Sequence, residues 1–179
     1  MTAEKIAPEG ILKLKFKTDA GLGSRANIGM IVLSSDQTLE LEFRTLLDFE
    51  GVALYHARIP NEMEITEGTL AQMEAELPIT ASLLPTSFNF DVIGYGCTSG
   101  TTIIGEGRVA KAIRTAHPGI LVTNPLTACK AALSALGLKR IAFLTPYKPA
   151  ITKAMRDNLM EEGFEIPVTA SFYESDDFV

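Results

Sequence analysis

Residues 93–101 read IGYGCTSGT, and this stretch gives the clearest signal of the fold. An apolar run that starts at Phe90 ends here at a glycine, and a cysteine followed by small hydroxyl residues comes next. A short apolar run bounded by glycines is typical of a buried strand. We therefore expect a strand over residues 90–95, with Cys97 just beyond its carboxyl end.

Outward from this stretch, apolar runs rich in β-branched residues alternate with segments of helical spacing. We expect further strands at 27–33, 51–59, 120–125, 140–147 and 164–172. The expected helices cover 37–47, 66–84 (which Pro78 bends or interrupts), 106–116, 126–136 and 150–162. This alternation predicts an α/β fold, with a parallel sheet flanked by helices, and residues 1–26 form a polar N-terminal arm outside it.

Composition excludes several classes of protein. The net charge is −6 and Lys and Arg do not cluster, which argues against nucleic acid as a partner. No apolar stretch reaches the roughly 20 residues that span a bilayer, and the start of the chain does not resemble a signal peptide. Two cysteines without a secretory signal indicate a reducing compartment. We expect a soluble, cytoplasmic globular protein.

Three expected strand ends carry polar side chains, namely Ser35 and Asp36, Cys97, and Tyr147. In a parallel sheet such ends share one edge, where ligands bind, so we expect all three to face the same side. Backbone N–H groups at a helix start lower a thiol's pKa, which favours a Cys97 thiolate. The hydroxyls and amides of residues 98–101 can donate hydrogen bonds to a carboxylate or an enolate.

Each of these residues also has a purely structural interpretation. Cys97 can be a small buried apolar residue in a turn, and Asp36 can be a helix cap. Cys129 lies within an Ala- and Leu-rich helix and is expected to pack there. Two well-separated histidines and the absence of a CxxC motif predict no metal site. Neither a Walker loop nor a GxGxxG turn follows the first strand, so nucleotide binding rests on fold class alone.

Three segments together resemble a known family: IGMIVLSSDQTLELEF (28–43), GYGCTSGTTIIGE (94–106) and RIAFLTPY (140–147). They are similar to the aspartate/glutamate racemase superfamily, in the branch of maleate isomerase, arylmalonate decarboxylase and ectoine-utilisation racemase-like proteins. The resemblance implies two pseudo-symmetric α/β lobes with the active site between them and no metal or organic cofactor. On this basis residues 27–137 form the first lobe, and residues 138–179 begin a second, incomplete one.

The resemblance also implies roles for individual residues. Cys97 matches the first-lobe cysteine, which exchanges a proton in racemases and adds to the alkene in maleate isomerases. Thr98 and Ser99 match residues that cradle the substrate's anionic group. Tyr147 matches a tyrosine that hydrogen-bonds a substrate carboxylate.

Ser35 and Asp36 match the first-strand loop that lines the family's pocket. Maleate isomerases usually have asparagine at the position of Asp36. An anionic side chain there would repel a plain dicarboxylate and suit an ammonium group, or it would orient and deprotonate the thiol. This departure from the family's pattern therefore favours an amino-acid-like substrate.

The predicted function is a cofactor-independent isomerase or racemase that acts on a small carboxylate or amino acid through Cys97. The family's second cysteine belongs some tens of residues beyond Phe178, so we expect either a fragment of a longer protein or the loss of half the proton-transfer pair. An arylmalonate-type decarboxylase and a non-catalytic carboxylate-binding protein remain alternatives. Apolar surface that faces a missing lobe would favour a homo-oligomer.

Overall fold

The computed structural model describes residues 10–11, 13–62, 64, 66–87 and 89–174. Its larger sheet holds four parallel strands in the order β2-β1-β3-β4, with β1 at Ala26–Leu33, β2 at Val52–Ile59, β3 at Val92–Tyr95 and β4 at Leu121–Thr123. Ile31 of β1 is in register with Ala57 of β2 and with Tyr95 of β3. The central strands therefore end along one edge, and the predicted α/β fold with a parallel sheet is confirmed.

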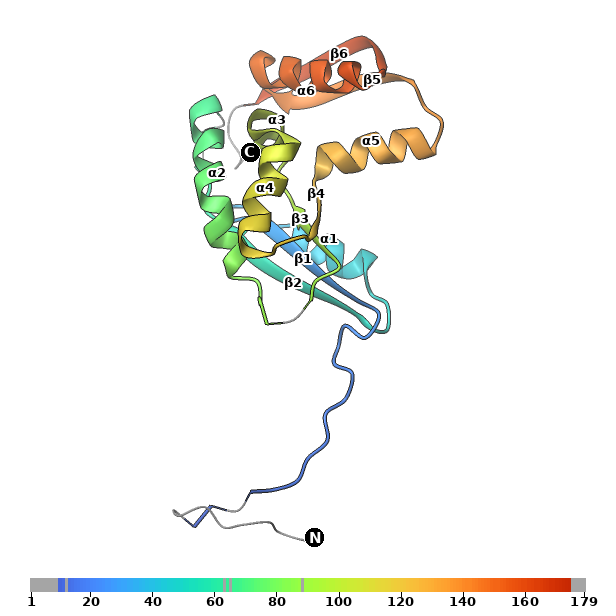
Figure 1. The fold of residues 1–179 in the computed structure, drawn as a ribbon. Helices are drawn as coiled ribbons and strands as arrows, with labels where there is room; N and C mark the ends of the chain where they lie inside the picture. The colour runs from blue at the N-terminus through green and yellow to red at the C-terminus, as the bar shows by residue number, and fades with distance from the viewer. Residues whose placement is uncertain (1–9, 12, 63, 65, 88, 175–179) are drawn as a thin grey trace.

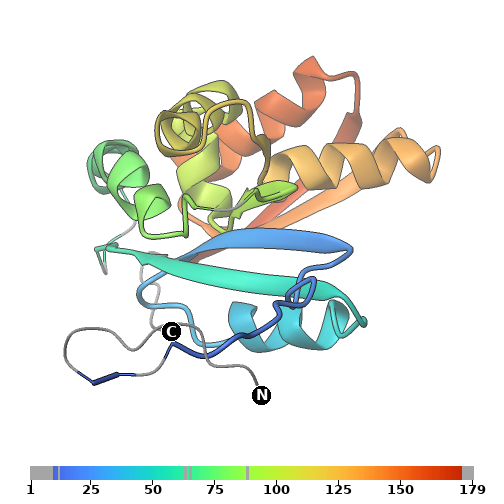
Figure 2. The same ribbon diagram turned by 60° about the horizontal axis from the view of Figure 1, so that its bottom comes forward.

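Helices lie on both faces of this sheet (Figures 1 and 2). One face carries α2 (Glu67–Ser82), α3 (Thr98–Ile104) and α4 (Glu106–Ala116), and the other carries α1 (Leu39–Leu46). Between the sheet and the three helices lies the main core, which includes Ile31, Ile59, Leu77, Ile93, Tyr95, Cys97, Val109 and Ile113. None of the residues of α1 is buried, so this helix covers its face only thinly.

The last part of the chain forms a second sheet. Strands β5 (Arg140–Tyr147) and β6 (Glu165–Glu174) pair in parallel, and α6 (Pro149–Glu161) connects them. The expectation that Tyr147 ends a strand of the same sheet as Cys97 is wrong, because β5 pairs only with β6 among the described residues. The unit docks through α6, whose Ile151 and Met155 join the main core, and it lies beyond α3 and α5 (Pro125–Ala135) in Figure 1.

Local signals explain most helix boundaries. Thr66 caps α2 through a capping box with Thr69, in which each hydroxyl accepts a hydrogen bond from the other residue's amide. Pro78 lies inside α2 without ending it. The short helix α3 was not predicted, because TSGTTII is rich in residues that form helices poorly. No helix among the described residues has the length and apolar character needed to span a membrane.

Candidate active site

Cys97 lies at the junction of β3 and α3, as its position in the sequence predicts. It is the N-cap residue of α3, and the backbone N–H of Gly100 donates a hydrogen bond to its Sγ at 3.2 Å. The Ser99 hydroxyl lies 3.7 Å from the same sulfur. Only 5% of Cys97 is exposed, so burial disfavours an ionised sulfur while the amide favours it.

Cys97 is buried, but it lines a small cavity. The cavity's free space is about 10 Å³, which is room for roughly one water molecule. Its wall combines apolar side chains of α2 with polar groups of the loop that follows β2. The lining residues are Leu33, Asn61, Glu62, Glu64, Thr69, Leu70, Met73, Cys97 and Ser99.

Asn61 connects the two loops that border this cavity, a role that the sequence analysis did not predict. Its Oδ1 accepts hydrogen bonds from the Ser34 hydroxyl at 2.9 Å and from the Ser35 amide at 3.1 Å. Its Nδ2 donates to the Ser35 hydroxyl at 2.9 Å. The loops after β1 and β2 are thereby joined beside Cys97. The signal in the sequence is an asparagine in the loop that follows the strand expected at 51–59.

Asp36 stabilises the start of α1. Its Oδ1 accepts hydrogen bonds from the amides of Thr38 at 2.9 Å and Leu39 at 2.7 Å. Asp36 does not belong to the lining of the Cys97 cavity, whereas Ser35 reaches that lining through Asn61. These two bonds support the interpretation that Asp36 stabilises the start of a helix. The carboxylates that line the Cys97 cavity belong to Glu62 and Glu64.

Thr98 and Ser99 are directed to different sides. Ser99 is buried and lines the Cys97 cavity. Thr98 lines a separate, mainly apolar pocket of about 240 Å³ between α1 and the start of α5, together with Met30, Phe43 and Ala128. Consecutive residues at a helix start point in different directions, and only Ser99 of the pair is beside Cys97.

Tyr147 is the last residue of β5 and is half-buried. Its side chain packs against the same core that contains Cys97, although it does not line the cavity. Its carbonyl oxygen accepts hydrogen bonds from the hydroxyls of Thr152, at 3.0 Å, and Ser171. These bonds hold the chain where it turns from β5 into α6.

The charge around the cavity is mainly negative. Glu62 and Glu64 both line it, and Lys148, next to Tyr147, reaches Glu64 with Nζ 3.7 Å from Oε1. This ion pair joins the β2–α2 loop to the β5–α6 loop. Both partners are largely exposed, so water screens the attraction and the contact contributes little to stability.

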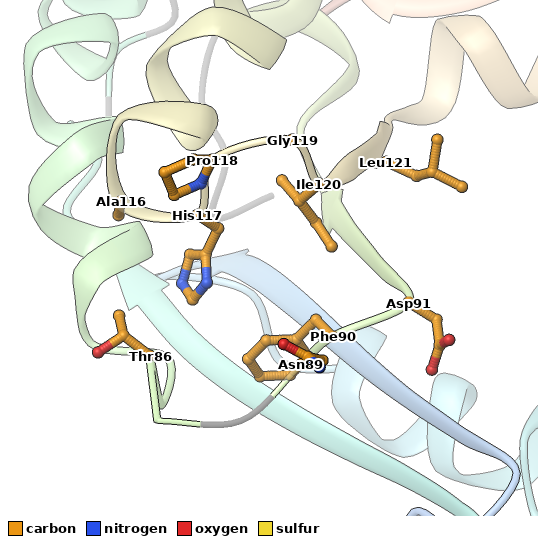
Figure 3. Close-up of a pocket in the computed structure, with 10 residues that line it drawn as sticks. All are labelled: Thr86, Asn89, Phe90, Asp91, Ala116, His117, Pro118, Gly119, Ile120 and Leu121. Atoms are coloured by element: carbon orange, nitrogen blue, oxygen red, sulfur yellow. The ribbon is translucent and has the colours of Figure 1, made fainter.

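A larger cavity lies at the opposite end of the strands (Figure 3). It has a free volume of about 320 Å³ and includes His117 and Phe90, whose rings pack edge to face. His117 is buried, and its Nε2 lies 2.9 Å from the carbonyl oxygen of Ala81. This arrangement holds the histidine in a structural position.

Two further expectations concern cysteine and metals. Cys129 is exposed on α5, so the prediction that it packs in the helix interface is wrong. Within the described part of the chain, no group of three or more His, Cys, Asp or Glu side chains could hold a metal ion.

Comparison with known proteins was made at the level of sequence and of structure. No protein-family profile matches the chain. The maleate isomerase of Pseudomonas putida is 28% identical over 151 residues, which are 78% of this chain and 60% of that protein. The maleate isomerase of Geobacillus stearothermophilus is 28% identical over 152 residues, with the same coverage of 78% and 60%. The chain thus spans about 60% of the length of these relatives.

Solved structures agree with this likeness. The maleate isomerase of Pseudomonas putida S16 with maleate superimposes with a TM-score of 0.69 at 26% identity, covering 84% of this chain and 65% of that one. A maleate cis–trans isomerase mutant of Nocardia farcinica, which carries a covalently bound succinylcysteine intermediate, gives a TM-score of 0.68 at 26% identity and the same coverage. An arylmalonate decarboxylase mutant matches in fold, with a TM-score of 0.67 at 21% identity over 84% of this chain and 63% of that one.

Sequence and structure comparisons point to the same proteins, which are those that the segments around Asp36, Cys97 and Tyr147 resemble. Together the comparisons support the resemblance of this chain to the maleate isomerase branch of the aspartate/glutamate racemase superfamily, and arylmalonate decarboxylase shares its fold.

Proposed function

We propose that this chain provides the Cys97 half of a cofactor-independent isomerase that acts on a small carboxylic acid. The observation that carries the proposal is the setting of Cys97, which caps a helix, accepts a hydrogen bond from the Gly100 amide and lines a cavity. Relatives at 28% identity named maleate isomerase support the reaction type.

The chemistry proposed for Cys97 is reversible addition to a carbon–carbon double bond. The thiolate sulfur bonds to one alkene carbon, and the π electrons move onto the neighbouring carboxylate-stabilised carbon. Rotation about the resulting single bond follows, and the electrons then re-form the double bond and expel the thiolate. Hydrogen-bond donors near the carboxylate stabilise the charge that develops there.

The size of the cavity sets a condition on this proposal. Space for about one water is too small for a four-carbon acid, so substrate binding requires the described groups that line the cavity to move apart. The Glu64–Lys148 pair is exposed and weak, and it opposes such a movement only slightly.

The carboxylates of Glu62 and Glu64 favour one substrate class within this reaction type. Two negative side chains beside Cys97 repel a plain dicarboxylate and attract an ammonium group. Within alkene isomerisation we therefore rank an unsaturated acid that carries an ammonium group above maleate. Racemisation by two thiols would need a second cysteine, and Cys129 cannot supply it because it lies exposed on α5.

The decisive experiment measures turnover by the protein and by its Cys97→Ala variant. Maleate, a set of amino acids in D₂O and a set of substituted malonates separate isomerisation, deuterium exchange at the α-carbon and release of carbon dioxide. We expect activity in one of the first two assays and its complete loss in Cys97→Ala, with Cys129→Ser as a matched control that retains it. Equal activity of Cys97→Ala and the parent protein would refute the proposal, and carbon dioxide release alone would favour a decarboxylase.

A non-catalytic role is the second candidate, and the absence of a second cysteine among the described residues that line the cavity is the observation that favours it. A protein of this kind would bind a small acid without converting it. Thermal stabilisation by an acid that undergoes no reaction in any of the three assays would support this role.

A further inference from the structure

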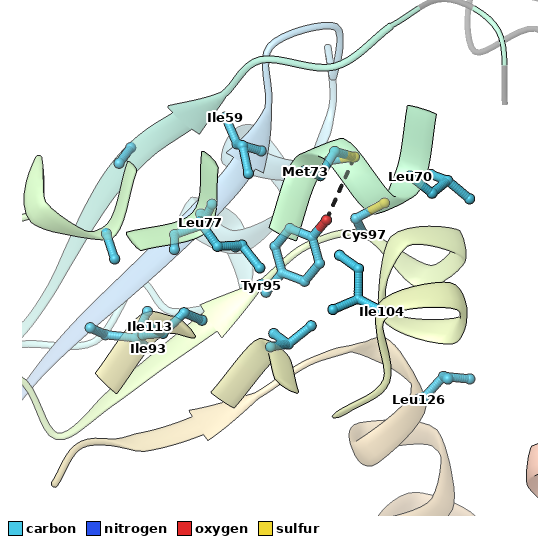
Figure 4. Packing of buried hydrophobic residues seen from close by; sticks show 14 of the residues in the cluster. Ile59, Leu70, Met73, Leu77, Ile93, Tyr95, Cys97, Ile104, Ile113 and Leu126 are labelled. Carbon is cyan, nitrogen blue, oxygen red and sulfur yellow. Dashed lines mark hydrogen bonds between the residues drawn. The ribbon is translucent and has the colours of Figure 1, made fainter. Parts of the chain in front are cut away.

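The hydroxyl of Tyr95 lies close to two sulfur atoms in the core, those of Met73 and Cys97. Tyr95 is the last residue of β3, two positions before Cys97, and only 1% of it is exposed. Its Oη lies 3.8 Å from the Sδ of Met73 on α2, and Figure 4 shows Cys97 beside this contact.

Gly100 shows how close the Tyr95 hydroxyl and the Cys97 sulfur are to each other. A Cβ atom built on Gly100 would lie 2.5 Å from the Tyr95 oxygen and 2.9 Å from the Cys97 sulfur. Both atoms therefore occupy the space that a side chain at position 100 would need. Because Gly100 has no side chain, the Tyr95 hydroxyl and the Cys97 sulfur can approach each other closely.

The Tyr95 hydroxyl remains protonated over the range in which a thiol ionises. Burial raises the pKa of Tyr95 far above its usual value. The charge of Cys97 and a hydrogen bond between Tyr95 and the Cys97 side chain raise it further. The hydroxyl is thus a permanent donor with a single proton. A thioether such as that of Met73 is a weak acceptor, whereas a thiolate is a charged and much stronger one.

We propose that Tyr95 is a positioning residue whose hydroxyl donates a hydrogen bond to the Cys97 sulfur, and that this bond strengthens as the sulfur ionises and replaces the contact with Met73. The Gly100 amide and the Tyr95 hydroxyl then form two donors around one buried thiolate. This inference rests on the proposed function, in which the Cys97 thiolate is the reacting group.

The other charged groups near Cys97 make such a donor necessary. Glu62 and Glu64 line the same cavity and oppose a negative sulfur, and Lys148 offsets only Glu64. The helix α3, which Cys97 caps, contains no charged residue, and α2 turns the apolar side chains of Leu70 and Met73 to the cavity. Within the described residues that line the cavity, only uncharged donors can stabilise the thiolate.

The test measures ionisation of Cys97 directly. In a Cys129→Ser background Cys97 is the only cysteine, so ultraviolet absorbance of the thiolate and the rate of alkylation by iodoacetamide both report on it. In Tyr95→Phe we expect the midpoint of ionisation to move to higher pH. Loss of one hydrogen bond to a charged group corresponds to a roughly tenfold lower thiolate fraction below that midpoint.

Two control variants separate the hydroxyl from packing. Tyr55→Phe removes a hydroxyl on β2, where the ring packs edge to face on Phe90, and Met73→Leu replaces the second sulfur with a residue of similar volume. Both are expected to keep the midpoint of the parent protein. A midpoint in Tyr95→Phe equal to that of the parent, or an equal upward shift in Met73→Leu, would overturn the proposal.

A second measurement uses the unchanged tyrosine. Ultraviolet resonance Raman spectra of the parent protein report whether tyrosine hydroxyls donate strong hydrogen bonds. We expect a change in donor strength as Cys97 ionises, absent from Cys97→Ala, and no such difference would count against the proposal. Because these readouts need no turnover, a shifted midpoint in a protein without activity would refute the proposed function while leaving the role of Tyr95 intact.

Discussion

At the scale of single residues, the candidate site depends on a glycine as much as on a cysteine. Gly100 supplies the amide that binds the Cys97 sulfur, and its missing side chain leaves room for the Tyr95 hydroxyl. The sequence pattern IGYGCTSGT places both glycine and cysteine at a strand end, but their contacts with Tyr95 arise from the fold. Three residues of one short segment therefore share one small volume.

Gly100→Ala tests this crowding. Alanine raises the helix propensity of α3 by up to about 1 kcal/mol, whereas an overpacked core costs about 1–3 kcal/mol. The new Cβ would meet the buried Tyr95 oxygen at 2.5 Å, so we expect the cost to exceed the gain and the free energy of unfolding to fall. Urea denaturation measures this difference.

Gly107→Ala is the matched control for that prediction. Gly107 lies in α4, and a Cβ there would meet no atom within 4 Å. Only the propensity term applies, so we expect this variant to be at least as stable as the parent protein. If Gly100→Ala were as stable as Gly107→Ala, the close approach of Tyr95 would not restrict which residue can occupy position 100.

At the scale of secondary-structure elements, loop contacts decide the geometry of the site. Asp36 holds the start of α1, and Asn61 joins the β1–α1 loop to the β2–α2 loop. Arg58 adds hydrogen bonds from its guanidinium to the carbonyl oxygens of Ser34 and Asp36. The carboxyl end of β1 is thereby fixed from several directions before any ligand binds.

Substitution of Asp36 distinguishes its cap from a role in substrate choice. Asp36→Ala removes the acceptor of two amide hydrogen bonds, and we expect a loss of about 1 kcal/mol of unfolding free energy. Asp36→Asn keeps a carbonyl oxygen in place, so its stability is expected to stay close to that of the parent protein. A loss as large as that of alanine would show that the negative charge, rather than the acceptor, stabilises α1.

At the scale of the whole molecule, a polar cluster joins the β5–α6–β6 unit to the larger sheet's helices. Lys130 of α5 donates from Nζ to Glu106 Oε2 of α4 at 2.6 Å and reaches Glu162, just after α6, at 3.4 Å. The Thr127 hydroxyl donates to the other oxygen of Glu106 at 2.5 Å. Only 13% of the Lys130 side chain is exposed, so this ion pair is better shielded from water than the surface pairs.

Lys130→Met is expected to destabilise the protein by about 1–2 kcal/mol near neutral pH. Burial raises the pKa of Glu106, but hydrogen bonds from Lys130 and Thr127 outweigh it and lower the pKa below its ordinary 4.5. The contribution of Glu106 is thus present above pH 4.5 and is lost as the pH falls through its folded pKa.

The pKa of Lys130 moves in the opposite direction. Burial lowers it, but the bonds to Glu106 and Glu162 raise it above 10.5 in total, so its contribution is lost only at pH values above that. The stability difference between parent and Lys130→Met should therefore shrink on acidification, as denaturation at several pH values can show. Lys153→Met, which breaks an exposed pair with Asp157, serves as a control with little effect at any pH.

The outer face of the β5–β6 sheet leads to a prediction about association. Its exposed apolar side chains include Leu144 at 61%, Val168 at 59% and Phe172 at 75% exposure. Parallel sheets are normally covered on both faces, so we expect this protein to self-associate in a concentration-dependent way. Sedimentation of the double variant Leu144→Lys/Phe172→Lys should reveal weaker association than that of the parent protein. The control Leu41→Lys on α1 should associate as the parent does. Equal association of the parent, the double variant and the control would exclude this face as the interface.

Sequence by itself determined the order of the strands and of every helix except α3, and the place of Cys97 after a strand, because these depend on local patterns of apolar residues, glycines and caps. The tertiary structure decided which of the predicted site residues meet. It separates β5 from the larger sheet, turns Thr98 away from Ser99, exposes Cys129, and brings Asn61 and Tyr95 to the site. Strand pairing and the direction of a side chain depend on contacts between distant segments, which the spacing of residues along the chain does not record.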